Sequence, residues 1–235
     1  MNLLLLLPED LISPDHARLT GRRLRHVREV HRAVVGEDLT VGLLGGRMGR
    51  GRVLRVDDEG LELALSLDGE PPPKLPLTLL IAVPRPKVLN RVVAAAASLG
   101  AARIVLLNAW KVEKAYWASP LMKPENLREQ LLLGLEQAKD TVLPELRLAR
   151  LFRPFVEDEL PGLLGGGTGL LAHPGTGGVA PKVLGAPITL AIGPEGGWIE
   201  AEARSLTEAG LRPLDLGPRI LRTETALAAL VGRLF

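Results

Sequence analysis

The sequence predicts an α/β protein in two parts: a small strand-rich module, then a mostly parallel sheet with helices on both faces. Short apolar runs separated by turn residues fill positions 1 to about 70, and three consecutive prolines follow at 71–73. From Leu75 onward, apolar strands alternate with helical segments. Such alternation is typical of a parallel sheet that is buried on both faces. We therefore expect one domain at residues 1–73 and a second at 74–235.

The first module should contain strands and one helix. Its leucine run at 3–7 is far too short to cross a membrane and predicts a buried strand. Ser13 followed by Pro14 matches the start of a helix, which we expect to continue through Val30. Turn residues separate three later apolar segments, a pattern that favours a small β-barrel or sheet. These expected strands cover residues 38–44, 51–56 and 61–67.

The second part alternates strands with helices up to the C-terminus. Glycine or proline follows most of its apolar or helical segments and predicts where each one ends. The expected strands cover residues 77–83, 103–107, 145–151, 169–172, 188–192 and 213–216. The expected helices cover residues 87–99, 124–139 and 199–209, with a last one capped by Thr223 or Thr225 and ending near Leu234.

Composition excludes several classes of function. The chain has no cysteine, which excludes a disulfide framework, a thiolate metal site and a cysteine nucleophile. Its four histidines show no metal-ligand spacing, so we expect no metal. No targeting segment is evident, and we expect a cytoplasmic protein.

Arginines cluster in the first module although the net charge of the whole chain is only +2. Six lie between Arg18 and Arg32 against the single acid Glu29, and four more lie between Arg47 and Arg55. Guanidinium groups match phosphate oxygens, so one interpretation is contact with nucleic acid. The other is an arginine-rich surface in contact with solvent. The candidates for RNA binding are Arg22, Arg23, Arg25, Arg28 and Arg50.

Two loops near the C-terminus carry the chemistry. Gly193–Trp198 (GPEGGW) and residues 216–226 (LGPRILRTETA) each follow an apolar run, and ligands bind beyond the carboxyl ends of strands in open α/β sheets. The glycines let a ligand approach the main chain, and the arginines suit phosphate or carboxylate. Ordinary turns with solvated side chains remain the alternative. Looser GxGxxA patterns at 167–172 and 175–180 open no clear helix and only weakly indicate a dinucleotide site.

The two loop motifs, in this order and about twenty residues apart, resemble the C-terminal signature of the RsmE family. These are 16S rRNA uridine-N3 methyltransferases of the SPOUT superfamily. Gly134–Ala138, the pair His26-Val27 and Gly36–Asp38 also resemble segments of this family. The resemblance covers the whole chain.

This resemblance implies a PUA-like RNA-binding β-barrel at 1–73 and a SPOUT methyltransferase domain with a C-terminal trefoil knot at 74–235. It implies S-adenosylmethionine (SAM) as the cofactor, a homodimer, and methylation of uridine N3 in 16S rRNA of the small ribosomal subunit. Arg222 would stabilise the uracil oxygen, and Glu195 would orient the base or assist proton removal. The cofactor would contact Leu171, His173, Ile192, Gly193, Glu195, Gly197, Leu216, Gly217, Ile220, Leu221, Arg222 and Thr223.

The chain departs from the family pattern on the side expected to face RNA. Ser98, Lys139 and the segment 111–117 stand where the family has other residues. A different RNA target therefore remains open. Two further alternatives are a non-catalytic RNA-binding protein of the same fold, and a metabolic enzyme whose glycine loops bind a nucleotide.

Overall fold

The computed structural model describes residues 2–177 and 187–235. The chain forms two compact units. The first contains the residues up to Pro73 together with Leu132–Leu143, and the second contains Lys74–Leu131 and Pro144–Phe235. Residues 70–74 form no helix or strand.

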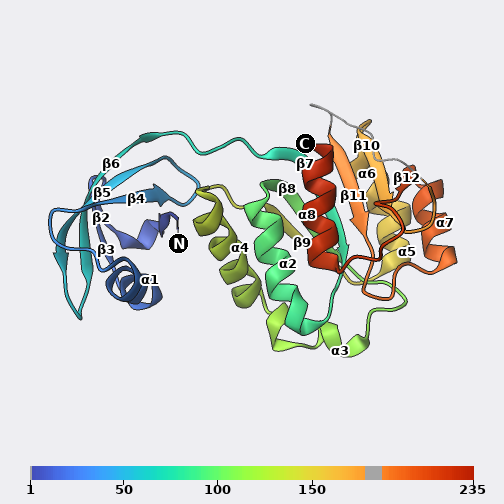
Figure 1. Ribbon diagram of the computed structural model, residues 1–235, viewed down its shortest axis with the longest axis horizontal. Coiled ribbons are helices and arrows are strands. Elements are labelled where there is room, and N and C mark those ends of the chain that lie inside the picture. The colour runs from blue at the N-terminus through green and yellow to red at the C-terminus, as the bar shows by residue number, and fades with distance from the viewer. Residues whose placement is uncertain (1, 178–186) are drawn as a thin grey trace. The chain divides into compact units, whose positions relative to one another are not determined.

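The first unit contains a curled six-stranded sheet in the order β1-β4-β5-β6-β3-β2 (Figure 1). β1 runs parallel to β4, and the other neighbours are antiparallel. Leucine and valine side chains from both ends of the sheet share one core with Leu24 and Val27 of the adjoining helical segment. The strands are β1 (Leu4–Leu6), β2 (Leu11–Ser13), β3 (His16–Leu19), β4 (Asp38–Leu43), β5 (Met48–Val56) and β6 (Leu61–Gly69).

The predicted helix start at Ser13 is wrong. Ser13 ends β2, and its hydroxyl donates a hydrogen bond to Asp15 Oδ1 at 2.6 Å in the turn that leads into β3. Ala17 and Leu19 alternate with exposed positions and are fully buried, because β3 pairs with β6. The helix begins only at Gly21, as α1 (Gly21–His26), and continues as a π-helical segment, Val27–His31. Pairing with a distant strand therefore overrides the local helix-start signal.

The second unit contains a six-stranded sheet in the order β12-β10-β11-β7-β8-β9, and every neighbouring pair is parallel. This confirms the predicted parallel sheet. β11 is buried along its whole length and β7 and β8 along most of theirs, as expected where helices cover both faces. The strands are β7 (Leu75–Ala82), β8 (Ala101–Leu107), β9 (Glu145–Ala149), β10 (Thr168–Ala172), β11 (Ile188–Ile192) and β12 (Leu211–Leu214).

Long helices match the predicted ones to within a few residues. Figure 1 shows α2 and α8 side by side against the sheet. These are α2 (Pro86–Ser98), α4 (Pro124–Ala138), α7 (Glu200–Glu208) and α8 (Thr223–Leu234). The sequence did not predict the shortest helices, α3 (Lys114–Trp117), α5 (Phe152–Pro154) and α6 (Leu160–Leu164). Arg222, not a threonine, is the N-cap residue of α8, and no side chain caps that helix.

One predicted strand near the pocket loops needs correction. β12 begins and ends two residues before the expected strand at 213–216, and it pairs with β10 at the edge of the sheet. An edge strand tolerates Pro213, which has no N–H to donate. The glycine pattern at 167–172 opens no helix, as expected, and contains the whole of β10, which confirms the predicted strand at 169–172. The pattern at 175–180 extends beyond the described residues.

Candidate functional site

A pocket lies in the second unit, beyond the carboxyl ends of β10, β11 and β12. Its cavity volume is about 110 Å³, and the free space including the open mouth is about 690 Å³. Three loops form it, and most of its lining side chains are apolar. The lining residues are Ala172, His173, Pro174, Ile192, Gly193, Pro194, Glu195, Gly197, Trp198, Leu214, Asp215, Leu216, Arg219, Ile220, Leu221, Thr223, Ala226 and Leu230.

The sheet order explains why loops distant in sequence meet here. β10 lies between β11 and β12, so the loop after β10 separates the two loops that carry the sequence motifs. A side chain at Gly193 would place its Cβ 3.1 Å from Trp198 Nε1, which is a very tight contact. The glycine therefore leaves room for the Trp198 indole, which is only 4% exposed, to close one wall of the pocket.

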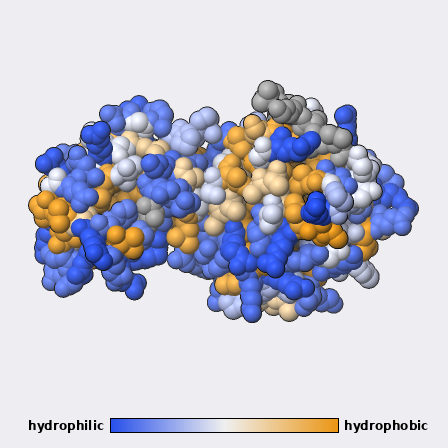
Figure 2. Space-filling model, in the orientation of Figure 1, coloured by the Kyte–Doolittle hydropathy of each residue, from blue (hydrophilic) through white to orange (hydrophobic). Residues whose placement is uncertain are grey.

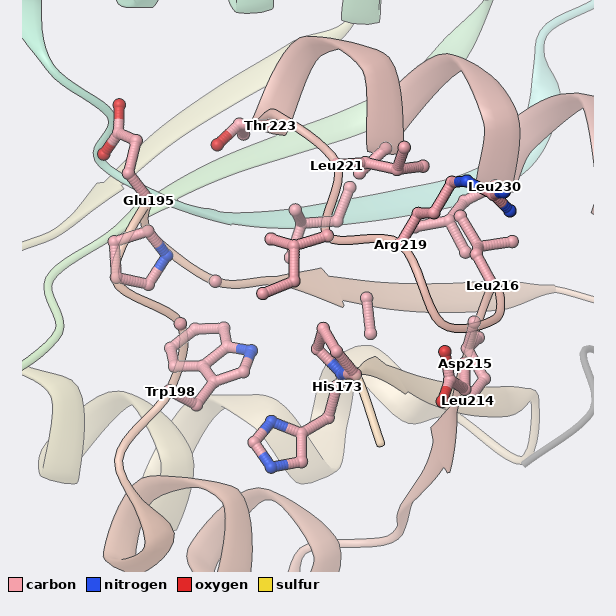
Figure 3. Close-up of a pocket in the computed structure, with 18 residues that line it drawn as sticks. His173, Glu195, Trp198, Leu214, Asp215, Leu216, Arg219, Leu221, Thr223 and Leu230 are labelled. Carbon is pink, nitrogen blue, oxygen red and sulfur yellow. The ribbon is translucent and has the colours of Figure 1, made fainter. Parts of the chain in front are cut away.

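Two polar atoms in the lining are buried without a hydrogen-bond partner in the described structure. They are His173 Nδ1 and Trp198 Nε1, and both residues are among the lining residues drawn in Figure 3. Buried polar atoms are almost always hydrogen-bonded, so unpaired ones need an explanation. A bound ligand with polar edges would supply the missing partners.

Asp215 joins two of the three loops. Its Oδ1 accepts a hydrogen bond from the backbone N–H of Gly217, and its Oδ2 accepts one from Gly175, both at 2.8 Å. These bonds from Gly217 and then Gly175 lower the pKa of the Asp215 carboxyl below its ordinary value, since they favour the charged form. The carboxylate thus fixes the loop after β10 against the loop after β12.

Replacing Asp215 with alanine should loosen this joint and weaken ligand affinity in the pocket by about tenfold. The pKa of Asp215 is depressed in the folded protein. The charged carboxylate therefore stabilises the two joined loops fully at pH values above its unfolded pKa, and this stabilisation is lost as the pH falls through the folded pKa. Ligand affinity of the wild type, measured by calorimetry, should therefore be constant near neutral pH and fall in the acid range. Asp215→Asn should have a weaker acid dependence. Equal affinities for wild type and Asp215→Ala would show that the joint is dispensable.

Most of the candidate cofactor residues line the pocket. Those that do are His173, Ile192, Gly193, Glu195, Gly197, Leu216, Ile220, Leu221 and Thr223. Leu171 is buried within β10, and Gly217 and Arg222 also lie outside the lining. Sequence reasoning missed Asp215 as a functional residue, because its partner Gly175 lies 40 positions away and no local pattern connects the two.

Glu195 has a fixed position at one side of the pocket, opposite Asp215 in Figure 3. Its Oε1 accepts a hydrogen bond from the backbone N–H of Arg85, the N-cap residue of α2, at 2.9 Å. The side chain is exposed, and its other oxygen remains available to a substrate. The nearby Tyr116 is no candidate base, since its hydroxyl donates to Glu113 Oε1 at 2.9 Å and this bond raises the pKa of Tyr116.

The five arginines predicted to bind RNA divide into two groups. Three are committed to acids: Arg22 to Glu136 at 3.0 Å, Arg23 to Asp10, and Arg28 to Asp58. Glu136 and Asp10 are buried, so the first two of these ion pairs hold the unit together.

Two of the candidates for RNA binding have no acidic partner. Arg25 and Arg50 are exposed, and neither side chain forms an ion pair or hydrogen bond within the described residues. These two guanidinium groups are free to contact phosphate.

The described part of the chain shows neither a metal-binding cluster nor a membrane-spanning helix. Within residues 2–177 and 187–235, no group of histidine and acidic side chains could hold a metal ion. No helix of the described chain is long and apolar enough to span a membrane. Figure 2 shows hydrophilic side chains over much of one face, with apolar side chains in separate patches.

Comparison with known proteins gives consistent matches. Residues 71–234 match the RNA methyltransferase domain family. The chain is 31% identical over 217 residues to ribosomal RNA small subunit methyltransferase E of Treponema pallidum, covering 88% of this chain and 80% of that protein. It is 28% identical to the protein of the same name in Synechocystis, over 95% of this chain and 73% of that protein.

Solved structures share the fold over nearly the whole chain. A methyltransferase from Legionella pneumophila in complex with SAM superposes with a TM-score of 0.73 at 26% identity, covering 99% of this chain and 96% of that one. Ribosomal RNA small subunit methyltransferase E from Neisseria gonorrhoeae, bound to S-adenosyl methionine, superposes with a TM-score of 0.77 at 23% identity. That match covers 99% of this chain and 95% of the other, and it shows the fold alone.

Proposed function

Because this chain belongs to the RNA methyltransferase family that includes ribosomal RNA small subunit methyltransferase E, we propose that it methylates N3 of a uridine in 16S rRNA, using SAM. The observation that carries this proposal is the pocket beyond β10, β11 and β12. Two of its three loops are the motifs GPEGGW and LGPRILRTETA. A site of this kind, at the carboxyl ends of parallel strands, is where an α/β sheet binds a small ligand.

The pocket fits a cofactor that has both apolar and polar parts. Its lining is mainly apolar, and two buried lining atoms, His173 Nδ1 and Trp198 Nε1, have no hydrogen-bond partner within the described residues. The residues that would hold SAM are the lining residues at the three loops, with Leu171 and Gly217 supporting them from behind. Asp215 would keep two of these loops in place.

When bound, SAM supplies a methyl group that is already activated for transfer. The protein must then position the uridine and manage its N3 proton, because a neutral imide nitrogen is a poor nucleophile. Arg222 is exposed at the N-cap of α8, with no side-chain partner in the described chain, and would stabilise the negative charge that develops on a uracil oxygen. The free oxygen of Glu195 would orient the base or accept the proton.

The finer features of the fold follow from the same proposal. The first unit would be the PUA-like RNA-binding domain, with Arg25 and Arg50 as its phosphate contacts. The second unit would carry the C-terminal knot of the SPOUT superfamily. The return of β12 to pair with β10, after the chain has formed β11, supports this topology. We also propose that the active form is a homodimer.

A direct test combines cofactor binding with product identification. Calorimetry with SAM should show one site per chain, and incubation with unmodified small-subunit rRNA should yield 3-methyluridine in a nucleoside digest. Binding of SAM with methylation at another nucleoside would reject uridine N3. Absence of SAM binding would favour a non-catalytic RNA-binding protein, and binding of a dinucleotide instead would favour a nucleotide-dependent enzyme.

A further inference from the structure

The segment at 110–117 concentrates accessible aromatic side chains. The chain has only three phenylalanines, three tryptophans and one tyrosine, and three of these seven aromatics are Trp110, Tyr116 and Trp117. The segment follows β8, at the same carboxyl edge of the sheet as the pocket.

Trp110 is the one of these three aromatics whose side chain has no partner among the described residues. Trp117 donates from Nε1 to Asn108 Oδ1 at 2.9 Å, and the Arg150 guanidinium lies over its ring at 5.2 Å. Tyr116 is bonded to Glu113. Trp110, by contrast, is 80% exposed. Tryptophan is enriched at binding surfaces, where its ring supplies a large apolar contact area and its N–H stays accessible.

The backbone of Trp110 is nevertheless held firmly beside the pocket. Its N–H donates to Oε1 of the buried Glu202 at 2.7 Å, and the neighbouring Ala109 and Val112 are buried. The next residue, Lys111, donates from Nζ to the carbonyl oxygen of Gly196, in the loop that lines the pocket, at 2.6 Å. The exposed indole is therefore presented on a fixed loop that is tied to the cofactor site.

The charge around this ring suits a polyanion. Four cations lie on the segments that meet here: Arg85, Lys111, Lys114 and Arg150. None of them forms an ion pair within the described residues. The exposed acids of the same segments are Glu113, which is bonded to Tyr116, and Glu195, which is bonded to the backbone of Arg85.

We propose that Trp110 is a stacking platform for an unpaired base of the RNA substrate, close to the methylated nucleotide, with Lys114 and Arg150 contacting the adjoining phosphates. Single-stranded RNA is commonly held by aromatic side chains that stack on splayed bases and by cations along its backbone. This inference rests on the proposed function, since it assumes that the pocket serves an RNA methyltransferase.

The test compares wild type, Trp110→Ala and Trp110→Phe in binding single-stranded oligouridylate of about 12 nucleotides. Fluorescence anisotropy should show about tenfold weaker binding for Trp110→Ala, the loss expected for one base–aromatic stack, and less than about threefold for Trp110→Phe. Binding of duplex RNA should be equal in all three proteins, because its bases are not available to stack. The oligouridylate should also quench the tryptophan fluorescence of wild type more than that of Trp110→Phe.

Equal oligouridylate affinity for wild type and Trp110→Ala would overturn the inference. So would an equal loss in the Trp110→Phe variant, or a change in oligomeric state for Trp110→Ala, which would assign the ring to a protein contact. SAM affinity, measured on the same samples, should be unchanged in both variants. If wild type does not bind SAM, the proposed function fails; if SAM binds but Trp110→Ala has no effect on RNA, only the stacking platform fails.

Discussion

Replacing Arg222 with alanine is expected to lower kcat for rRNA methylation by about 100-fold or more, the usual loss when one charged donor to a developing oxyanion is removed. The structure gives the physical reason. Arg222 precedes the first residue of α8 in an extended conformation, lies outside the pocket lining, and has no side-chain partner within the described residues. SAM affinity should therefore stay within about threefold of wild type, since the charge acts on the methyl acceptor.

Two further variants test whether the loss of activity is specific to the Arg222 guanidinium group. Arg222→Lys keeps the charge without the planar fork and should recover part of the activity. Arg212→Ala removes an exposed arginine from β12 and should leave kcat unchanged. The measurement is single-turnover methyl transfer to small-subunit rRNA, with SAM affinity determined by calorimetry. A parallel loss of SAM affinity and activity in Arg222→Ala would instead place this residue in cofactor binding.

Replacing Arg23 with alanine is expected to lower the free energy of unfolding of the first unit by about 3 kcal/mol. Asp10 is 8% exposed, and both of its carboxylate oxygens accept hydrogen bonds from the Arg23 guanidinium. The same guanidinium also donates to the carbonyl oxygen of Leu5 at 2.9 Å. Its removal leaves a buried carboxylate whose one remaining hydrogen-bond donor within the described residues is the backbone N–H of Leu7. Urea denaturation of the full chain would measure the change.

Arg25→Ala is the matched control for this experiment. Arg25 lies on the same helix, is exposed and has no partner in the described chain, so its loss should alter stability by less than about 0.5 kcal/mol. It should instead weaken RNA binding and reduce the salt dependence of that binding. If Arg23→Ala kept full stability and weakened RNA binding as Arg25→Ala does, the ion pair with Asp10 would have no structural role.

The arginine cluster shows how far a charge pattern can be interpreted. The sequence places six arginines between residues 18 and 32, and all of them look alike as potential phosphate ligands. Folding separates them, because Glu136 approaches Arg22 from 114 positions away and Asp10 approaches Arg23 from 13 positions away. A pattern of charges contains no information about which distant acid will be brought beside which arginine.

The same distinction applies to secondary structure. The long helices were predictable because apolar residues recur at helical spacing, and the strands of the parallel sheet because they are short apolar runs that glycine or proline mostly ends, although β12 was placed two residues too late. The helix start predicted at Ser13 and Pro14 was wrong. Pairing of β3 with β6 and burial of Ala17 and Leu19 stabilise the strand more than the local sequence favours a helix. The free energy that favours a helix at a few residues is small compared with the free energy gained by burying apolar side chains in the core.

By itself, the sequence determined the parallel α/β architecture, the two glycine-bearing loops and, through their motifs, the family. Only the tertiary structure decided that the loop after β10 lies between those two loops, that Asp215 fastens it to one of them, and that Trp110 stands exposed beside the pocket. The physical reason is the distance along the sequence over which each kind of interaction acts. Periodicity and turn chemistry act over a few residues, whereas the pocket depends on strand order and on hydrogen bonds between residues up to 110 positions apart.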